Sequence, residues 1–339
     1  MNTLIYCVAG YSGGHIIPAY HYAQSLNPNR ITFFTTTNPL DTTIIKNLDT
    51  KIHHIPTYPL KTPSFKKPLS WFVFVYHFFS LFFKTIRWIQ KDRPSRVIST
   101  GGIISIPFCL AAFFLRIPII LIELNAIPGK TTRFLAFFAT TIHVCFSEAI
   151  PFFSKRKCSL ISYPMPKQNE TIPTKEEARN HLCIPSDKKT ILLMGGSQGS
   201  QSLNNLFINC ISTDIPFFQT VTILHQVGNN DIQSIQSWYD KVSVTAKVFS
   251  FFSPTKYLYA ASDIVICRAG AGTLFELLHF EKSALIIPLE NVADNHQLAN
   301  ALAFIKHHQN QFSLLRQKDL ILNQAPLFNF IKEKLGKQA

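Results

Sequence analysis

The segment 263–276 constrains the fold of this chain more than any other stretch. Its β-branched run, residues 264–266, predicts a short strand buried on both faces, as in a parallel sheet. A small-residue turn follows, and a helix is predicted to begin at Thr273. Because the N–H groups at a helix start bind anions, this turn is a candidate phosphate site that needs no metal. Glu276, on the first helical turn, would then accept hydrogen bonds from neutral hydroxyls such as those of a ribose. The alternative is a carboxylate that only offsets the helix dipole.

Strand-like and helix-like segments alternate along the chain, and glycine-rich turns connect some of them. These turns lie at 9–14, 101–102 and 195–199. The alternation predicts two doubly wound α/β domains with parallel sheets. A basic, proline-containing stretch at 154–173 marks the boundary, so we predict domains at 1–163 and 164–339. The last helix, predicted at 327–335, could pack back on the first domain.

The composition indicates an anionic partner. Lys and Arg number 33 against 19 acidic residues, a formal net charge of +14, so nucleic acid, anionic lipid and a phosphorylated substrate are all candidates. No nucleic-acid-binding signature is present, and nucleic acid therefore ranks last. The 7 cysteines form no C-x-x-C pair, and no His, Cys and Asp cluster has metal-ligand spacing. With a strand at 4–8 in place of a signal peptide, the protein is expected to stay in the cytoplasm.

An apolar, aromatic run at 69–83 lies between basic residues. Lys66 and Lys67 precede it, and four more cations follow at Lys84, Arg87, Lys91 and Arg93. The run is shorter than the ~20 residues that a membrane-spanning helix needs. Its composition is typical of a helix that lies on an anionic membrane surface, and a buried core helix with a solvated basic end is the alternative.

Two motifs have more than one interpretation. Residues 195–199 match the G-x-S-x-G turn of acyl hydrolases, and Asp263 or Asp294 with His296 would complete a triad in chain order. That interpretation leaves the glycine turns of the first half unused, and we disfavour it. His15, at a predicted helix start, is either a neutral general base or a residue that caps the turn; its place in a glycine-rich loop favours the base.

Read together, these turns resemble one family: the peptidoglycan glycosyltransferases that add N-acetylglucosamine to lipid I, making lipid II, on the cytoplasmic membrane face. The matching stretches are 10–19, 101–107, 125–129, 195–199 with 203–204, 225–228, 268–276 and 294–301. They keep the order and spacing of the family from residue 4 to about residue 301.

The resemblance implies the GT-B fold, in which two Rossmann-like doubly wound parallel-sheet domains face a central cleft. It implies UDP-N-acetylglucosamine as the donor, bound by the second domain, and lipid I as the acceptor, bound by the first, with no cofactor and no metal. The implied donor-binding residues are Gly196, Ser197, Gln198, Gly199, Arg268, Ala271, Gly272, Thr273, Glu276, His296 and Gln297. The implied acceptor-binding residues are Ser12, Gly13, Gly14, Gly101, Gly102, Ser105 and Asn125.

The resemblance also implies a mechanism. The acceptor C4 hydroxyl attacks the anomeric carbon from the face opposite UDP, which inverts α to β, and His15 is the candidate catalytic base. Backbone N–H groups meet the charge on the leaving UDP, and Glu276 takes the ribose hydroxyls. An anionic membrane surface and other cell-wall synthesis proteins are the further partners expected for a peripheral enzyme on the cytoplasmic face.

The sequence departs from the family at a few positions near the site. These are Tyr11, Ile103, Ile122, Leu124 and Pro166. They leave two alternatives open: a catalytically weak homologue that binds lipid as a scaffold, and a related transferase with another glycolipid acceptor. Because His15, Glu276 and the turn at 195–199 are all retained, we favour a working enzyme.

Overall fold

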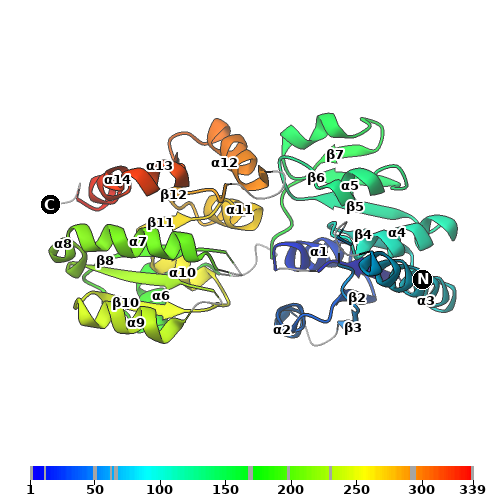
Figure 1. The fold of residues 1–339 in the computed structure, drawn as a ribbon, viewed down its shortest axis with the longest axis horizontal. Coiled ribbons are helices and arrows are strands. Elements are labelled where there is room, and N and C mark those ends of the chain that lie inside the picture. The colour runs from blue at the N-terminus through cyan, green and yellow to red at the C-terminus, as the bar shows by residue number, and fades with distance from the viewer. Residues whose placement is uncertain are drawn as a thin grey trace. The chain divides into compact units, whose positions relative to one another are not determined.

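The computed structural model describes residues 3–10, 13–48, 52–61, 63–64, 68–166, 171–196, 199–228, 231–290 and 295–336. The chain forms two compact units, Met1–Lys167 and Gln168–Ala339 (Figure 1). The predicted boundary followed residue 163. Both positions lie within the stretch 154–173 that marks the predicted boundary, and this stretch also contains a strand at Cys158–Leu160.

The first unit is built on a seven-stranded parallel sheet with the order β3-β2-β1-β4-β5-β6-β7. Its strands are β1 Leu4–Val8, β2 Arg30–Thr36, β3 His53–Thr57, β4 Arg96–Ser99, β5 Ile119–Glu123, β6 Thr141–Val144 and β7 Cys158–Leu160. Its helices are α1 Gly13–Ser25, α2 Pro39–Leu48, α3 Leu69–Asp92, α4 Ser105–Phe114 and α5 Lys130–Leu135, with the 3-10 helix η1 Ser147–Phe152. Buried side chains of α3, α4 and α5 form one core with the sheet, around Tyr6, Phe34 and Phe108.

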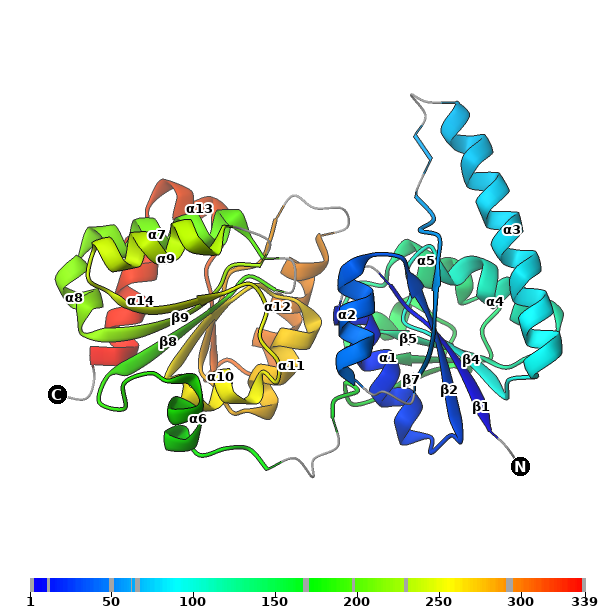
Figure 2. The same cartoon turned by 90° about the horizontal axis from the view of Figure 1, so that it is seen from below.

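Helix α3 contributes its buried side chains to this core from its second half, while Phe74 and Phe78 of the first half pack against it as partly buried side chains. Leu81 and Ile89 are buried, and the Tyr6 hydroxyl donates a hydrogen bond of 2.6 Å to Asp92 Oδ2 at the end of the helix. The first half stands away from the sheet of its own domain (Figure 2). The apolar run predicted at 69–83 is therefore half core and half surface.

The second unit has a six-stranded parallel sheet with the order β10-β9-β8-β11-β12-β13. Its strands are β8 Lys189–Met194, β9 Val221–Gln226, β10 Thr245–Phe249, β11 Ile264–Cys267, β12 Ala284–Ile286 and β13 Phe312–Leu314. Its helices are α6 Lys175–Leu182, α7 Gln201–Thr213, α8 Ile215–Gln219, α9 Ile232–Lys241, α10 Lys256–Ala261, α11 Ala271–His279, α12 His296–His307, α13 Gln317–Leu322 and α14 Ala325–Gly336.

The last helix, α14, packs inside the second unit. Leu327, Ile331 and Leu335 lie in the same core cluster as Leu203 and Phe207 of α7. Its apolar face is therefore buried against the sheet and helices of its own domain, and its packing on the first domain stays a prediction.

Candidate active site

Both sets of glycine turns lie where the order of the strands reverses. In the first sheet the reversal falls between β1 and β4, whose following turns are 9–14 and 100–104. In the second it falls between β8 and β11, followed by 195–200 and 268–270. Open parallel sheets bind ligands at this crevice, outside the carboxyl ends of the strands. The fold therefore brings the motifs of each half together at the position where a ligand is expected.

His15 joins the two turns of the first domain. It lies on the first turn of α1, and its Nδ1 is 2.9 Å from the carbonyl oxygen of Thr100, the residue after β4. The Thr100 hydroxyl in turn donates to the carbonyl oxygen of His15 over 3.1 Å. Since a carbonyl only accepts, Nδ1 carries the proton in the neutral ring and Nε2 carries the lone pair. This is the tautomer that a general base facing a ligand needs.

The second glycine turn of this domain is held by serine hydroxyls. Gly101 and Gly102 have φ values of +97° and +82°, which favour glycine. The Ser99 hydroxyl donates to Ser105 Oγ, and the Ser105 hydroxyl donates to the carbonyl oxygen of Gly101, both over 2.7 Å. Ser105 is fully buried. Ser105 stabilises the turn from inside the domain, so we no longer expect it to contact the acceptor as the resemblance implied.

The other predicted acceptor residues belong to the start of α1 and to the loop after β5. Gly13 is buried and Gly14 is exposed at the beginning of α1, while Ser12 lies outside the described residues. Asn125 follows β5, and its backbone N–H and side-chain amide both donate to Glu123 Oε1, over 3.0 and 3.1 Å. The other carboxylate oxygen of Glu123 accepts from the N–H of Gly129. The buried Glu123 thus fixes the loop that carries Asn125.

The turn at 195–200 is closed by tight backbone packing. Gly196 and Gly199 have φ values of +84° and +75°, and the N–H of Gly199 donates to the carbonyl oxygen of Gly196 over 2.9 Å. A Cβ on Gly199 would lie 2.2 Å from the carbonyl oxygen of Val227. Ser197 and Gln198, predicted to meet the donor diphosphate, lie outside the described residues.

Replacing Gly199 with alanine is expected to displace this turn and to weaken binding of UDP about tenfold or more. The new methyl group must move the backbone at Val227, and the left-handed conformation adds about 1 kcal/mol of strain. Gly196→Ala is the matched variant, since it has the same sign of φ but nothing within 4 Å of its Cβ. Titration calorimetry with UDP measures both. Equal losses in the two variants would contradict the packing argument.

Arg268, a donor contact implied by the resemblance, is held by side chains and carbonyl groups of its own domain. Its side chain is buried, and the guanidinium donates to the Ser200 hydroxyl from Nε and Nη2, over 3.0 and 2.7 Å. Nη2 also donates to Ser202 Oγ and to Gln317 Oε1, and Nη1 donates to the carbonyl oxygen of Ile287. Burial lowers the pKa of Arg268 to about 10. We infer that it ties the turn at 195–200 to its neighbours.

The helix at the end of the segment 263–276 starts two residues earlier than predicted. It begins at Ala271, so the N–H groups of Ala271, Gly272 and Thr273 form its first turn and Glu276 lies on the second. The electrostatic effect of a helix end falls off within the first turn. Glu276 is therefore not explained as an offset to the helix dipole, and the alternative, an acceptor for ligand hydroxyls, gains support.

The Glu276 carboxylate is set between two hydroxyls. The Tyr259 hydroxyl donates to Oε2 over 2.8 Å, and the Thr255 hydroxyl donates to Oε1 over 3.4 Å. Burial raises the pKa of Glu276, while these two hydrogen bonds lower it. The residue as a whole is only partly buried, which leaves part of it within reach of a ligand. Neither Tyr259 nor Thr255 was identified from the sequence.

A buried polar chain supports the turn at Gly199 from behind. His225 Nδ1 is 3.0 Å from the Tyr239 hydroxyl, and its Nε2 is 3.1 Å from Asn204 Oδ1. The Asn204 amide donates to the carbonyl oxygen of Val227 over 3.5 Å. Burial lowers the pKa of His225 to about 3, which keeps the ring neutral. The histidine of the stretch 225–228 is thus a buried support for the turn.

The predicted sugar contacts begin α12. Gln297 accepts a hydrogen bond of 2.9 Å at Oε1 from the N–H of Leu289, so one end of its amide holds the segment after β12. His296, the first residue of the helix, is partly buried beside it. The side chain of Asn300, one turn on, donates to the carbonyl oxygen of Ala269 over 3.3 Å. These contacts bring the start of α12 next to the turn before α11.

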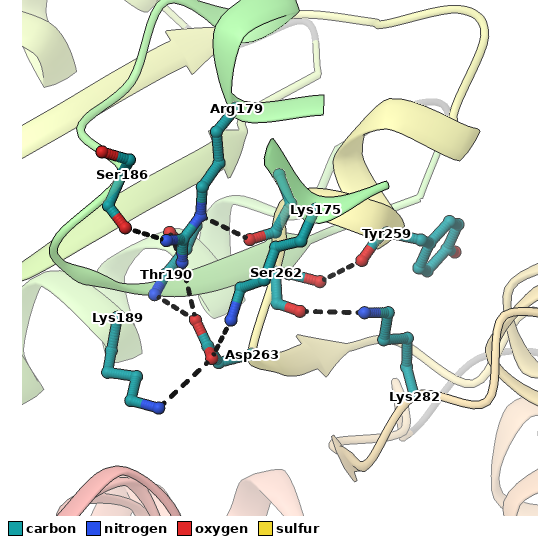
Figure 3. A network of polar contacts seen from close by, with 10 residues as sticks. Lys175, Arg179, Ser186, Lys189, Thr190, Tyr259, Ser262, Asp263 and Lys282 are labelled. Carbon is teal, nitrogen blue, oxygen red and sulfur yellow. Dashed lines mark hydrogen bonds and ion pairs between the residues drawn. The ribbon is translucent and has the colours of Figure 1, made fainter. Parts of the chain in front are cut away.

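The hydrolase triad does not form through Asp263. Asp263 precedes β11, whereas the turn with the serine motif follows the neighbouring parallel strand β8, so the two lie at opposite ends of these strands. Asp263 Oδ2 accepts from Arg179 and from the N–H of Thr190, and Oδ1 accepts from Lys175 over 2.6 Å (Figure 3). Asp294, the other candidate, lies outside the described residues. In the part of the chain that the structure describes, no group of three or more His, Cys, Asp or Glu residues could hold a metal ion.

Comparison with known proteins agrees with this architecture. The profile of the glycosyltransferase family 28 N-terminal domain matches residues 5–144, and that of the C-terminal domain matches residues 190–325. A UDP-N-acetylglucosamine--N-acetylmuramyl-(pentapeptide) pyrophosphoryl-undecaprenol N-acetylglucosamine transferase from Prosthecochloris aestuarii is 30% identical over 330 residues, 96% of this chain and 88% of the relative. The protein of the same name from Myxococcus xanthus is 28% identical over 309 residues, 90% of this chain and 78% of the relative.

A solved structure shares the fold. The crystal structure of Acinetobacter baumannii MurG superposes with a TM-score of 0.68 at 22% identity, covering 100% of this chain and 93% of that protein. The prediction of a GT-B fold with two parallel-sheet domains is confirmed. By its two domain matches and its full-length relatives, this chain belongs to glycosyltransferase family 28 and, within it, to the family of the pyrophosphoryl-undecaprenol N-acetylglucosamine transferases.

Proposed function

We propose that this chain is an inverting glycosyltransferase that moves N-acetylglucosamine from UDP-N-acetylglucosamine to lipid I, forming lipid II. The observation that carries the proposal is the crevice between β8 and β11, which combines a glycine turn, a helix start and a carboxylate. Amides and a helix start suit a diphosphate, and a carboxylate suits the two hydroxyls of a ribose. The relatives named above carry the same activity in their names.

In the proposed reaction, the acceptor C4 oxygen forms a bond to the anomeric carbon of the donor sugar as the bond from that carbon to the UDP oxygen breaks. The hydroxyl proton passes to Nε2 of His15, whose other nitrogen is held by Thr100. UDP leaves with its electron pair, and the growing charge on the diphosphate is met by backbone N–H groups of 195–199 and of the first turn of α11.

Transfer of labelled N-acetylglucosamine from UDP to a lipid I analogue tests the proposal. We expect a lipid II product with UDP-N-acetylglucosamine and much slower transfer from other UDP-sugars. Donor binding without turnover would contradict an enzyme and favour the lipid-binding scaffold. Turnover only with a different glycolipid would favour a related transferase.

We further propose that the protein is peripheral on the cytoplasmic face of the membrane and binds there through α3. Among the described residues, one helix, α3, is long enough and apolar enough to cross a membrane. Its second half is part of the core of the first domain, which favours surface binding over spanning. Large apolar side chains recur every three or four residues along its exposed side. They are Leu69, Phe72, Tyr76, Phe79 and Phe83.

Cations lie next to this exposed apolar stripe. Lys84, Arg87, Lys91 and Arg93 are exposed along and just after the second half of α3. Basic groups near the surface of an anionic membrane contribute about 1 kcal/mol each. Lys66 and Lys67, the cations predicted before the helix, lie outside the described residues.

Polar substitution of the stripe is expected to release the protein from membranes. We predict that Phe72→Ser, Tyr76→Ser and Phe79→Ser together reduce cosedimentation with vesicles of anionic phospholipid at least tenfold, since each buried aromatic ring contributes about 1.5–3 kcal/mol. The matched control is Ile321→Ser with Leu322→Ser, which removes two exposed apolar side chains from α13. Vesicle binding that survives the triple change, or that the control also loses, would contradict the proposed surface.

A further inference from the structure

A buried tyrosine, Tyr259, holds the carboxylate of Glu276 in place. Tyr259 lies on α10, its side chain is fully buried, and its ring stacks on Phe280 with centroids 4.9 Å apart and planes at 14°. Its hydroxyl donates a hydrogen bond of 2.8 Å to the Glu276 carboxylate. Because Tyr259 is buried and Glu276 is partly exposed, the tyrosine cannot touch a ligand in the crevice, but the carboxylate that it holds can.

The hydroxyl of Tyr259 is the stronger of two supports. Thr255 also donates to the carboxylate, but over 3.4 Å, near the limit for a hydrogen bond. Among the described residues, the groups that favour the ionised form of Glu276 are these two hydroxyls, and no cation is among them. A partly desolvated carboxylate without a cation depends on its hydrogen-bond donors for both its charge and its orientation.

We propose that Tyr259 is the positioning residue that aims the Glu276 carboxylate at the nucleotide ribose and so gives the donor site its preference for a ribonucleotide over a 2′-deoxyribonucleotide. The inference rests on the proposed function, in which Glu276 takes the ribose hydroxyls. Tyr259 occupies one lone pair of Oε2 and fixes the rotation of the carboxylate. The remaining lone pairs can then accept from two adjacent hydroxyls at once.

A fixed carboxylate discriminates because it cannot adapt to the wrong sugar. When the 2′ hydroxyl is missing, one carboxylate oxygen stays unpaired in a partly desolvated site, which costs more than a lost contact in water. A carboxylate that is free to turn would instead swing its charge toward solvent and lose little. The hydroxyl of Tyr259 therefore controls the ratio of the two affinities rather than their common value.

Tyr259→Phe tests this directly, because it keeps the ring stacked on Phe280 and removes one oxygen. We expect the affinity for UDP to fall about tenfold while the affinity for 2′-deoxy-UDP changes little, so the preference for the ribonucleotide shrinks by the same factor. Thr255→Val, which removes the longer hydrogen bond, should act in the same direction but less. Titration calorimetry on the full chain measures all of these affinities.

The matched control is Tyr239→Phe. Tyr239 is also fully buried in this domain, and its hydroxyl bonds to His225 instead of Glu276. A structural effect in this variant would lower both affinities together and leave their ratio unchanged. If Tyr259→Phe likewise lowers both affinities equally, or leaves both unchanged, the positioning role is overturned.

A further variant, Glu276→Gln, separates failure of this inference from failure of the proposed function. The inference expects Glu276→Gln to abolish most of the preference for the ribonucleotide, and Tyr259→Phe to add little in the double variant. Loss of the preference in Glu276→Gln but not in Tyr259→Phe overturns only the role of Tyr259. An unchanged preference in Glu276→Gln would instead overturn the ribose contact itself.

Discussion

Replacing His15 with alanine is expected to lower the turnover number about a hundredfold or more, with little change in affinity for UDP-N-acetylglucosamine. A positioned general base contributes typically 10²–10⁴-fold, and the hydrogen bond from Nδ1 to Thr100 leaves Nε2 as the basic atom. Donor affinity should hold because the proposed donor residues belong to the second domain. Steady-state transfer to a lipid I analogue gives the turnover number, and calorimetry with the donor gives the affinity.

His21→Ala is the control for this variant. His21 lies later on the same helix, α1, outside the glycine turns that form the proposed site. Its removal should leave turnover within a few-fold of the parent enzyme. An enzyme that turns over at the parent rate without His15 would exclude this residue as the base and would leave the acceptor hydroxyl without an assigned proton acceptor.

The Glu276→Ala variant is expected to lose about a hundredfold in affinity for UDP-N-acetylglucosamine while the protein stays folded. Each hydrogen bond to a charged group contributes about 1.5–3 kcal/mol, and the carboxylate accepts from two ribose hydroxyls in the proposed complex. The fold should persist because Glu276 is partly exposed and its removal takes a hydrogen-bond partner only from the hydroxyls of Tyr259 and Thr255. Calorimetry with UDP-N-acetylglucosamine and with UDP measures the loss.

The change in net charge has its own control. Glu176→Ala removes an exposed carboxylate from α6 of the same domain and should leave UDP affinity unchanged. A similar loss in Glu176→Ala would mean that long-range charge dominates. Unchanged affinity in Glu276→Ala would count against the ribose contact.

The central strands could be predicted from the sequence because both faces of a parallel strand are buried, which produces continuous apolar runs. The strands β1 and β11, predicted at 4–8 and 264–266, were placed within a residue or two on this basis. The strands that were missed, β3, β7 and β13, all lie at sheet edges. Edge strands need less apolar sequence and tolerate proline, as β3 does at Pro56.

For the candidate site too, features set by neighbouring residues could be predicted, and contacts between residues distant in sequence could not. Glycine turns after strands predicted where the crevices lie, since backbone conformation is a local property. Contacts across the fold were not predictable from spacing. Arg268 bonds to Gln317, and Tyr259 bonds to Glu276 from a different helix. Ser105 and His225 are polar in sequence, yet both are fully buried and bonded within the domain. The burial of each side chain distinguishes residues that can contact a ligand from residues that only hold the turns in place. The sequence does not reveal this burial residue by residue.

A crystal structure of the protein soaked with UDP tests the central claim most directly. We predict that the diphosphate lies against the turn at 195–199 and the N–H groups at the start of α11, with both ribose hydroxyls on the carboxylate of Glu276. A nucleotide bound anywhere other than this crevice of the second domain would contradict the proposed donor site and the mechanism built on it.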